Sequence, residues 1–236
     1  MRQLPLPIGF PPLPTFDNFH SGTQADALSH LRSLKMPAAP VYLWGPPGSG
    51  KSHLLSALVH AAQERGLRAG WFDAATPLPW PLAADWALVA IDRCDELDSA
   101  RQHAAFMLFV EAATHGTQVA AAGRLPPVDL AVREDLRTRL GWGPVFALRP
   151  LDEFASRAVL RREADRRGFL FPDDAMDFIL TRFERDLSHL MHLLDRLDRF
   201  ALARSRPVTV PLLKLMLAEE ADEAEGTHRP NPLSAT

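Results

Sequence analysis

Hydrophobic and polar positions divide the chain into two parts with different periodicities. In the first part, short and almost continuous apolar runs alternate with segments whose apolar residues recur at helical spacing. Continuous apolar runs are typical of strands covered on both faces, and their alternation with helices predicts a parallel sheet of the α/β class. The predicted strands are 41–44, 69–72, 86–92, 118–122 and 145–148. The predicted helices are 24–34, 54–62, 104–114 and 130–140.

From Pro150 onward only helical periodicity remains, which predicts a small helical domain over 150–220 after the α/β domain over 15–149. Both ends of the chain differ from this pattern. Prolines in residues 1–14 remove backbone donors and exclude a helix or a central strand, so we expect an extended arm. Residues 221–236 are acidic and then polar, and we expect them to be disordered. The predicted lid helices are 152–167, one opening at 173, 186–204, and one starting near 209 and fading at 219–220.

A phosphate-binding loop lies between the first predicted strand and the helix that follows it. The sequence GPPGSGKS is an unbroken G-x-x-x-x-G-K-[ST] motif. Its glycines allow backbone N–H groups to surround phosphate oxygens at a helix N-terminus. In such loops the lysine reaches the outer phosphates and the hydroxyl that follows it binds Mg²⁺, so we expect ATP or ADP as the ligand. The expected nucleotide-binding residues are Gly45, Pro46, Pro47, Gly48, Ser49, Gly50, Lys51, Ser52 and His53.

Asp92 ends the apolar run that starts at Trp86. A carboxylate at the C-terminal end of such a strand is where a phosphate-loop protein holds Mg²⁺, directly or through water. We therefore expect Ser52 and Asp92 to form the metal site, and the alternative is an ordinary acid at a strand end.

Gln3-Leu4-Pro5-Leu6 places two large aliphatic side chains at alternate positions of the extended arm, next to an amide. Such a segment can dock into apolar pockets on a partner at low entropic cost, because proline pre-extends it. From these residues alone, a binding peptide and a plain tail are equally plausible.

Charge and composition exclude some classes of function. The 236 residues carry a net charge of −3, which gives no general reason to bind nucleic acid or an anionic membrane. Arginines at 157, 161, 162, 166 and 167 are interspersed with acids and are expected to form a solvated face, and the alternative is a contact with DNA. One cysteine, no secretory signal and no apolar stretch near the ~20 residues of a membrane span together predict a cytoplasmic protein.

Four segments in order resemble the DnaA family of AAA+ P-loop ATPases: TFDNF at 15–19, the loop GPPGSGKSHLL, the strand end at Ile91-Asp92, and DLRTRL at 135–140. The resemblance covers residues 1–217. It leads us to expect a five-stranded AAA+ domain with a helical lid and without the initiator's helix-turn-helix domain. The arm is similar to the Q-L-x-L-P peptide that docks on the DNA polymerase sliding clamp. This combination resembles the Hda family, the regulatory inactivators of DnaA.

The resemblance implies two partners, the polymerase III β clamp and the initiator DnaA, and no sequence-specific DNA binding. Gln3, Leu4 and Leu6 would bind the clamp. Arg139 matches the family's arginine finger and would promote hydrolysis of DnaA-bound ATP in trans. The alternative for Arg139 is a surface arginine paired with Asp135 at i−4. Whether the protein forms a homodimer is left open.

Three departures from the family pattern predict that the chain's own ATP hydrolysis is slow or absent. Arg93 stands where hydrolysing AAA+ proteins carry a second acid, and Asp95 and Glu96 come too late to replace it. The polar residue expected near Arg124 is not a clear match, and the nucleotide-sensing arginine of the lid aligns with Ser188. Bound nucleotide would then stabilise one conformation.

Three rival functions remain open from the sequence. They are an autonomous motor or helicase loader, a different truncated initiator homologue that does not bind the clamp, and a small-molecule kinase.

Overall fold

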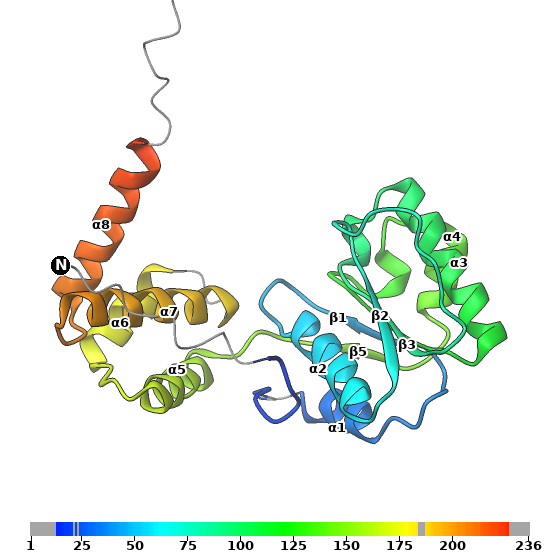
Figure 1. The fold of residues 1–236 in the computed structure, drawn as a ribbon, viewed down its shortest axis with the longest axis horizontal. Helices are drawn as coiled ribbons and strands as arrows, with labels where there is room; N and C mark the ends of the chain where they lie inside the picture. Colours follow the sequence, from blue (N-terminus) through cyan, green and yellow to red (C-terminus); the bar gives the residue numbers. More distant parts are fainter. Residues whose placement is uncertain (1–12, 21, 23, 184–186, 227–236) are drawn as a thin grey trace, which may run out of the picture. The chain divides into compact units, whose positions relative to one another are not determined.

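The chain divides into two compact units at the Leu151–Asp152 boundary. The structure is a computed structural model that describes residues 13–20, 22, 24–183 and 187–226. The first unit is an α/β domain, and the described residues of the second form helices and their connections (Figure 1). We describe each unit by itself.

A five-stranded parallel sheet with the order β2-β3-β4-β1-β5 forms the centre of the first unit. Its two longest strands, β3 and β4, are buried nearly throughout. Parallel strands need long crossover connections, and here helices supply most of them. The strands are β1 (Val41–Trp44), β2 (Arg68–Phe72), β3 (Trp86–Ile91), β4 (Gln118–Gly123) and β5 (Val145–Ala147). The five predicted strands are therefore confirmed, with ends that differ by at most one residue.

Helices cover both faces of the sheet (Figure 1). Helices α1 (Ala25–Ser33) and α2 (Lys51–Glu64) enclose one apolar cluster against Val41 and Leu43 of the first strand. Helices α3 (Ser99–His115) and α4 (Glu134–Leu140) enclose the other cluster, which contains Tyr42. Successive residues of β1 thus serve opposite layers, as the two-residue period of a strand requires.

Two short 3₁₀ helices, η1 (Cys94–Glu96) and η2 (Pro127–Asp129), follow β3 and β4. The sequence predicted a single helix over 130–140, and the structure differs from this directly after η2. Leu130 and Arg133 have extended backbone conformations, and the Arg133 N–H donates to the side-chain oxygen of Gln102 on α3, 3.0 Å away. Only the second half of the predicted segment is therefore helical, as α4.

Four helices around their own apolar core make up the second unit. They are α5 (Glu153–Arg167), α6 (Asp173–Arg182), α7 (Leu187–Arg204) and α8 (Val210–Gly226). The Asp152 carboxylate caps α5 by accepting from the Ala155 N–H, and Gly168 ends it in a left-handed conformation. Helix α8 continues to Gly226, past the acidic pair where the sequence predicted it to fade. In the part of the chain that the structure describes, no helix is long and apolar enough to cross a membrane.

Candidate functional site

The phosphate loop connects β1 to α2 through backbone conformations that suit glycine. Gly50, at the N-terminus of α2, has φ of +90°, and a Cβ there would lie 2.6 Å from the ring of Phe19. A Cβ on Gly45 would lie 2.1 Å from the carbonyl oxygen of Leu148. The loop therefore needs glycine at position 50 for both conformation and space, and at position 45 for space.

Lys51 is buried within this loop and holds it together. Its ammonium group donates to the carbonyl oxygens of Gly45 at 2.8 Å and Pro46 at 2.9 Å. It also lies 3.4 Å from the hydroxyl of Ser49. A positive charge is thus fixed among the loop's backbone groups, where phosphate oxygens would be bound in a P-loop protein.

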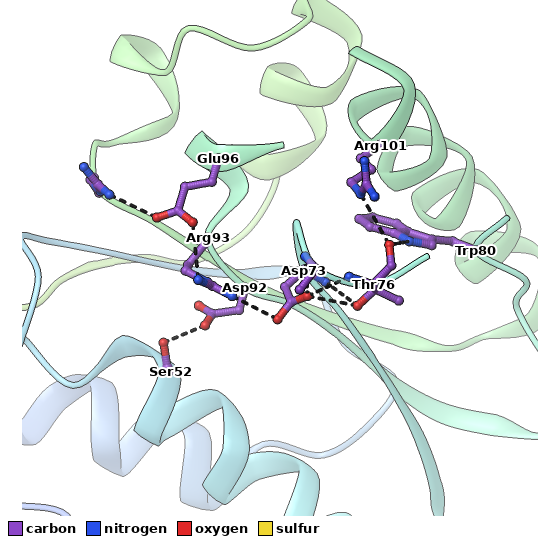
Figure 2. A network of polar contacts seen from close by, with 10 residues as sticks. Ser52, Asp73, Thr76, Trp80, Asp92, Arg93, Glu96 and Arg101 are labelled. Carbon is purple, nitrogen blue, oxygen red and sulfur yellow. Dashed lines mark hydrogen bonds and ion pairs between the residues drawn. The ribbon is translucent and has the colours of Figure 1, made fainter. Parts of the chain in front are cut away.

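Ser52 and Asp92 meet at the start of α2. The Ser52 hydroxyl donates to Oδ2 of Asp92 at 2.6 Å (Figure 2). Asp92 is only 3% exposed, and among the described residues its other oxygen, Oδ1, has no hydrogen-bond partner. Burial raises the pKa of this carboxyl, and the hydrogen bonds from the Ser52 hydroxyl and the Arg93 backbone N–H, together with the charges of Arg93 and Lys51, oppose that rise. An unsatisfied buried carboxylate oxygen is what a Mg²⁺-binding acid offers in the absence of the ion.

His53 links the loop helix to the segment that precedes α1. Its Nε2 lies 3.0 Å from the carbonyl oxygen of Thr15, so Nε2 carries the proton. The ring also packs against Phe19, with 5.4 Å between the centroids. Burial lowers the pKa of His53 despite this hydrogen bond, which favours the neutral imidazole. The TFDNF segment is thereby fixed beside the phosphate loop.

Arg93, directly after Asp92, is tied to two carboxylates (Figure 2). Its guanidinium lies 3.1 Å from Oδ2 of Asp73 and 3.3 Å from Oε2 of Glu96. Its backbone is left-handed, with φ of +52°, which is uncommon for a residue with a side chain. Asp73 follows β2 and also accepts from the Thr76 hydroxyl at 3.0 Å. Burial alone would raise the pKa of Asp73, but the bonds from Thr76 and Arg93 outweigh it and the pKa is lowered.

Arg124 extends this network to the end of β4. Its guanidinium lies 3.0 Å from Asp95 and 3.0 Å from Glu96, and its backbone N–H donates to Oδ1 of Asp95 at 2.9 Å. The acids that follow Asp92 in the sequence are therefore both paired with arginines. Together with the Arg93–Asp73 pair, these ion pairs join the segments that follow β2, β3 and β4.

Arg139, the candidate arginine finger, lies near the C-terminal end of α4 and does not pair with Asp135. That carboxylate accepts two bonds from Arg133, at 2.6 and 3.1 Å, which lower its pKa to about 2. The Arg139 guanidinium lies instead over the indole of Trp142, 3.8 Å from the ring centroid. The alternative of a local ion pair with Asp135 is therefore not what the structure contains.

The structure brings the predicted nucleotide-binding and metal-binding residues together around one loop, and it places Arg139 on a different element. The arm residues Gln3, Leu4 and Leu6 and the side chain of Ser188 lie outside the described part. Sequence reasoning did not single out Asp73 or Trp142. The sequence contained a signal for Asp73, because this acid directly follows the predicted strand 69–72, as Asp92 ends the next predicted strand along the chain.

The arginines of α5 are largely neutralised within the lid. Arg157 lies 3.8 Å from Glu153, and Arg166 and Arg167 pair with Glu163 at 2.5 and 2.7 Å. Arg161 pairs with Asp173. These pairs fit the expectation of a solvated, charge-balanced face.

Comparison with known proteins gives matches to the lid and to the whole fold. Residues 152–217 match the family described as the lid domain of Hda. Domain III of the replication initiation protein DnaA from Thermotoga maritima is similar, with a TM-score of 0.72 and 20% identity over 88% of this chain and 98% of that one. DnaA from Aquifex aeolicus bound to AMPPCP gives a TM-score of 0.62 and 18% identity over 90% and 70% of the two chains. The RuvB Holliday junction branch migration motor of Thermotoga maritima gives 0.58 and 16% over 81% and 64%.

At these identities the solved structures establish the fold, which is the AAA+ fold that the sequence predicted. The family match adds the type of lid. With a match to the Hda lid domain at 152–217 and the AAA+ fold before it, the chain is consistent with an Hda-like homologue of the initiator DnaA.

Proposed function

We propose that the protein is a regulatory adaptor that promotes hydrolysis of the ATP bound to DnaA and thereby prevents a second initiation of replication. It would bind ADP or ATP with Mg²⁺ in its own phosphate loop. Its N-terminal arm would bind the β sliding clamp, and Arg139 would act on the nucleotide of the neighbouring DnaA.

Nucleotide binding is supported by the fit of the loop residues to a phosphate group. Gly48 and Gly50 have positive φ values, which suit a loop that surrounds phosphate with backbone N–H groups, and Lys51 supplies a fixed positive charge. Ser52 and the unsatisfied Oδ1 of Asp92 provide the two oxygens of a Mg²⁺ site, whose other ligands would be phosphates and water. The AMPPCP-bound DnaA of Aquifex aeolicus, which shares the fold, supports the same proposal.

The Arg93 network supports a structural role for that nucleotide. Hydrolysis needs a group that orients and polarises the attacking water. The first two carboxylates after Asp92, those of Asp95 and Glu96, are already engaged by Arg93 and Arg124. We propose that bound nucleotide stabilises the folded AAA+ unit and that the protein's own turnover is slow or absent. Multi-turnover hydrolysis by the isolated protein at ordinary enzyme rates, about 1 s⁻¹ or faster, would contradict this.

The surroundings of Arg139 support its proposed role as an arginine finger that acts on a partner's nucleotide. An arginine finger stabilises negative charge on the transferring phosphoryl group, an effect of about 10³–10⁵ in rate. Such a role needs guanidinium N–H donors that are not already bound to a carboxylate. Arg139 has no ion pair among the described residues, whereas Arg93, Arg124 and Arg133 all have one.

Clamp binding is proposed from the sequence alone, because Gln3, Leu4 and Leu6 lie outside the described residues. Two aliphatic side chains at alternate positions of a proline-extended segment suit docking into apolar pockets. Tethering to the clamp would raise the local concentration of the protein near DnaA on the same DNA.

The observation that carries the proposal is the Hda lid at residues 152–217, because the AAA+ fold alone is shared with motors such as RuvB. The test is hydrolysis of ATP preloaded on DnaA, measured with DNA-loaded clamp and with wild type, Gln3→Ala, Arg139→Ala or Arg137→Ala. Acceleration by wild type and Arg137→Ala, but not by Gln3→Ala or Arg139→Ala, is expected. If no version accelerates hydrolysis, the adaptor function is wrong.

A further inference from the structure

The turn after α4 presents an exposed indole to the guanidinium of Arg139. The centre of that guanidinium lies 3.8 Å from the ring centroid of Trp142 and 6.0 Å from that of Phe106, which comes from α3. Both distances are within the range of cation–π attraction, and tryptophan is the strongest partner for it. Trp142 is nevertheless 57% exposed, so core packing does not explain its size.

Packing and backbone contacts anchor the chain on both sides of Trp142. Leu136 and Leu140 anchor α4 in the apolar core. The Trp142 N–H donates to the carbonyl oxygen of Arg139 at 3.2 Å, which turns the chain back toward the helix. Gly143 lies so close to the Pro40 carbonyl that a Cβ would be 1.9 Å from its oxygen. The turn is therefore pinned to the segment that leads into β1.

An aromatic face holds an arginine differently from a carboxylate. A carboxylate binds the N–H groups in the guanidinium plane and neutralises the charge, whereas an aromatic face contacts the plane itself and leaves those donors available. Asp135 lies four residues before Arg139, at the spacing of a helical ion pair, but its carboxylate accepts hydrogen bonds from Arg133 instead. Arg139 is thus restrained without losing its charge or its in-plane donors.

We propose that Trp142 is a positioning residue that holds the Arg139 guanidinium in the orientation needed for its action on a partner's nucleotide. The inference rests on the proposed function, since it assigns a task to Trp142 within the same reaction. Fixing the guanidinium before the partner binds avoids ordering a long, flexible side chain in the transition state. The rival role for an exposed tryptophan is to dock the partner through buried apolar area.

The first test separates positioning from docking. The rate of hydrolysis of DnaA-bound ATP is titrated with wild type, Trp142→Ala, Trp142→Leu and Trp142→Phe, after each has been matched for nucleotide binding and melting temperature. Positioning predicts a plateau rate about tenfold lower for the Ala and Leu variants, and a rate within about twofold of wild type for the Phe variant, because phenylalanine keeps an aromatic face. An unchanged plateau with a raised half-saturating concentration indicates docking and overturns the inference, as does a Leu variant equal to wild type.

The second test does not depend on the activity. Ring currents of the indole should displace the Nε–Hε resonance of Arg139, assigned by its loss in Arg139→Lys, away from those of exposed arginines. The displacement should disappear in Trp142→Leu. A resonance at the same position with and without Trp142 shows that there is no stack and overturns the inference, whether or not the protein activates DnaA. If wild type does not accelerate hydrolysis while the stack is observed, the proposed function fails and Trp142 has no positioning task.

Discussion

Two arginines of the AAA+ unit, Arg93 and Arg139, are held by opposite kinds of partner. Arg93 follows the acidic end of β3 and is bound by the carboxylates of Asp73 and Glu96. Arg139 lies near the end of α4 and rests on the indole of Trp142. Both side chains are ordered, but only one keeps its charge uncompensated.

The difference separates a structural task from a functional one. Carboxylates tie Arg93 into a network that joins the ends of three strands. An aromatic face contacts Arg139 without engaging its N–H donors with a carboxylate. In the proposed mechanism, one arginine therefore has a structural task and the other would offer its positive charge to a partner.

The largest effect should come from Arg139→Lys. Lysine keeps one positive charge but lacks the planar fork that binds several phosphoryl oxygens at once. We expect the acceleration of DnaA-bound ATP hydrolysis to fall by about 10³-fold, the lower end of the usual arginine-finger effect. Single-turnover hydrolysis of preloaded ATP measures it, and Arg137→Lys, two residues away on the same helix, should behave as wild type. Equal loss in both variants would mean that the effect is not specific to position 139, and no loss in either would mean that α4 acts only through its total charge.

The next effect should come from the arm. Gln3→Ala should reduce acceleration at low protein concentration by about 10²-fold, because clamp binding raises the effective concentration by at least that factor. Acceleration without clamp, measured at high protein concentration, should be unchanged. A variant that also fails there would show that the arm does more than tether. Binding to immobilised clamp gives an independent readout.

A moderate effect is expected from Asp92→Asn. Asparagine still accepts from Ser52 but removes a buried charge, so the nucleotide-free protein should gain roughly 1–2 kcal/mol and its melting temperature should rise by a few degrees. Extra stabilisation by Mg²⁺ with ADP should be reduced in the same variant. Thermal melts with ADP, with and without Mg²⁺, measure both changes. An Asp92→Asn protein that responds to Mg²⁺ as wild type does would exclude Asp92 from the metal site.

The gain from Asp92→Asn should depend on pH. The folded-state pKa of Asp92 is raised by burial, so the folded protein binds a proton there more readily than the unfolded chain does. Below the unfolded pKa both states are protonated and Asp92 has no cost. The cost develops as pH rises through the folded-state pKa. The difference in melting temperature between variant and wild type should therefore grow from acid toward neutral pH.

The smallest effect should come from Arg93→Ala. Its side chain is 45% exposed, and exposed ion pairs contribute about 1 kcal/mol or less, so the melting temperature should fall by only a few degrees. Acceleration of DnaA-bound ATP hydrolysis should be unchanged. Removal of the arginine alone should not create ATPase activity, because Glu96 stays paired with Arg124. Rapid multi-turnover hydrolysis by Arg93→Ala would show that Arg93 is the only block.

Local patterns were sufficient to predict the strands, the phosphate loop and the lid helices, because burial and helix ends leave residue-by-residue signals. The apolar run that ends at Asp92 and the helix stop at Gly168 are examples. The order β2-β3-β4-β1-β5 depends on pairing between distant segments, which periodicity does not contain.

The side-chain partners of the site could not be predicted for the same reason. Asp73 and Arg93 are 20 residues apart and meet only because β2 and β3 are neighbours. The sequence suggested Asp135 as the partner of Arg139, since the spacing allows it. For Arg139 the reason is different, because Arg133 and Trp142 are its near neighbours in the sequence. Both lie outside the helix Glu134–Leu140, so the spacing rule for pairs within a helix does not include them.

The most direct test of this comparison is the single-turnover rate at which DnaA hydrolyses its bound ATP in the presence of DNA-loaded clamp. The rate is measured side by side with the Arg139→Ala and Arg93→Ala variants of this protein. We predict that Arg139→Ala loses the acceleration by about 10³-fold or more and that Arg93→Ala retains it. If Arg93→Ala loses the acceleration and Arg139→Ala keeps it, the two arginines have the opposite tasks and the proposed mechanism is wrong.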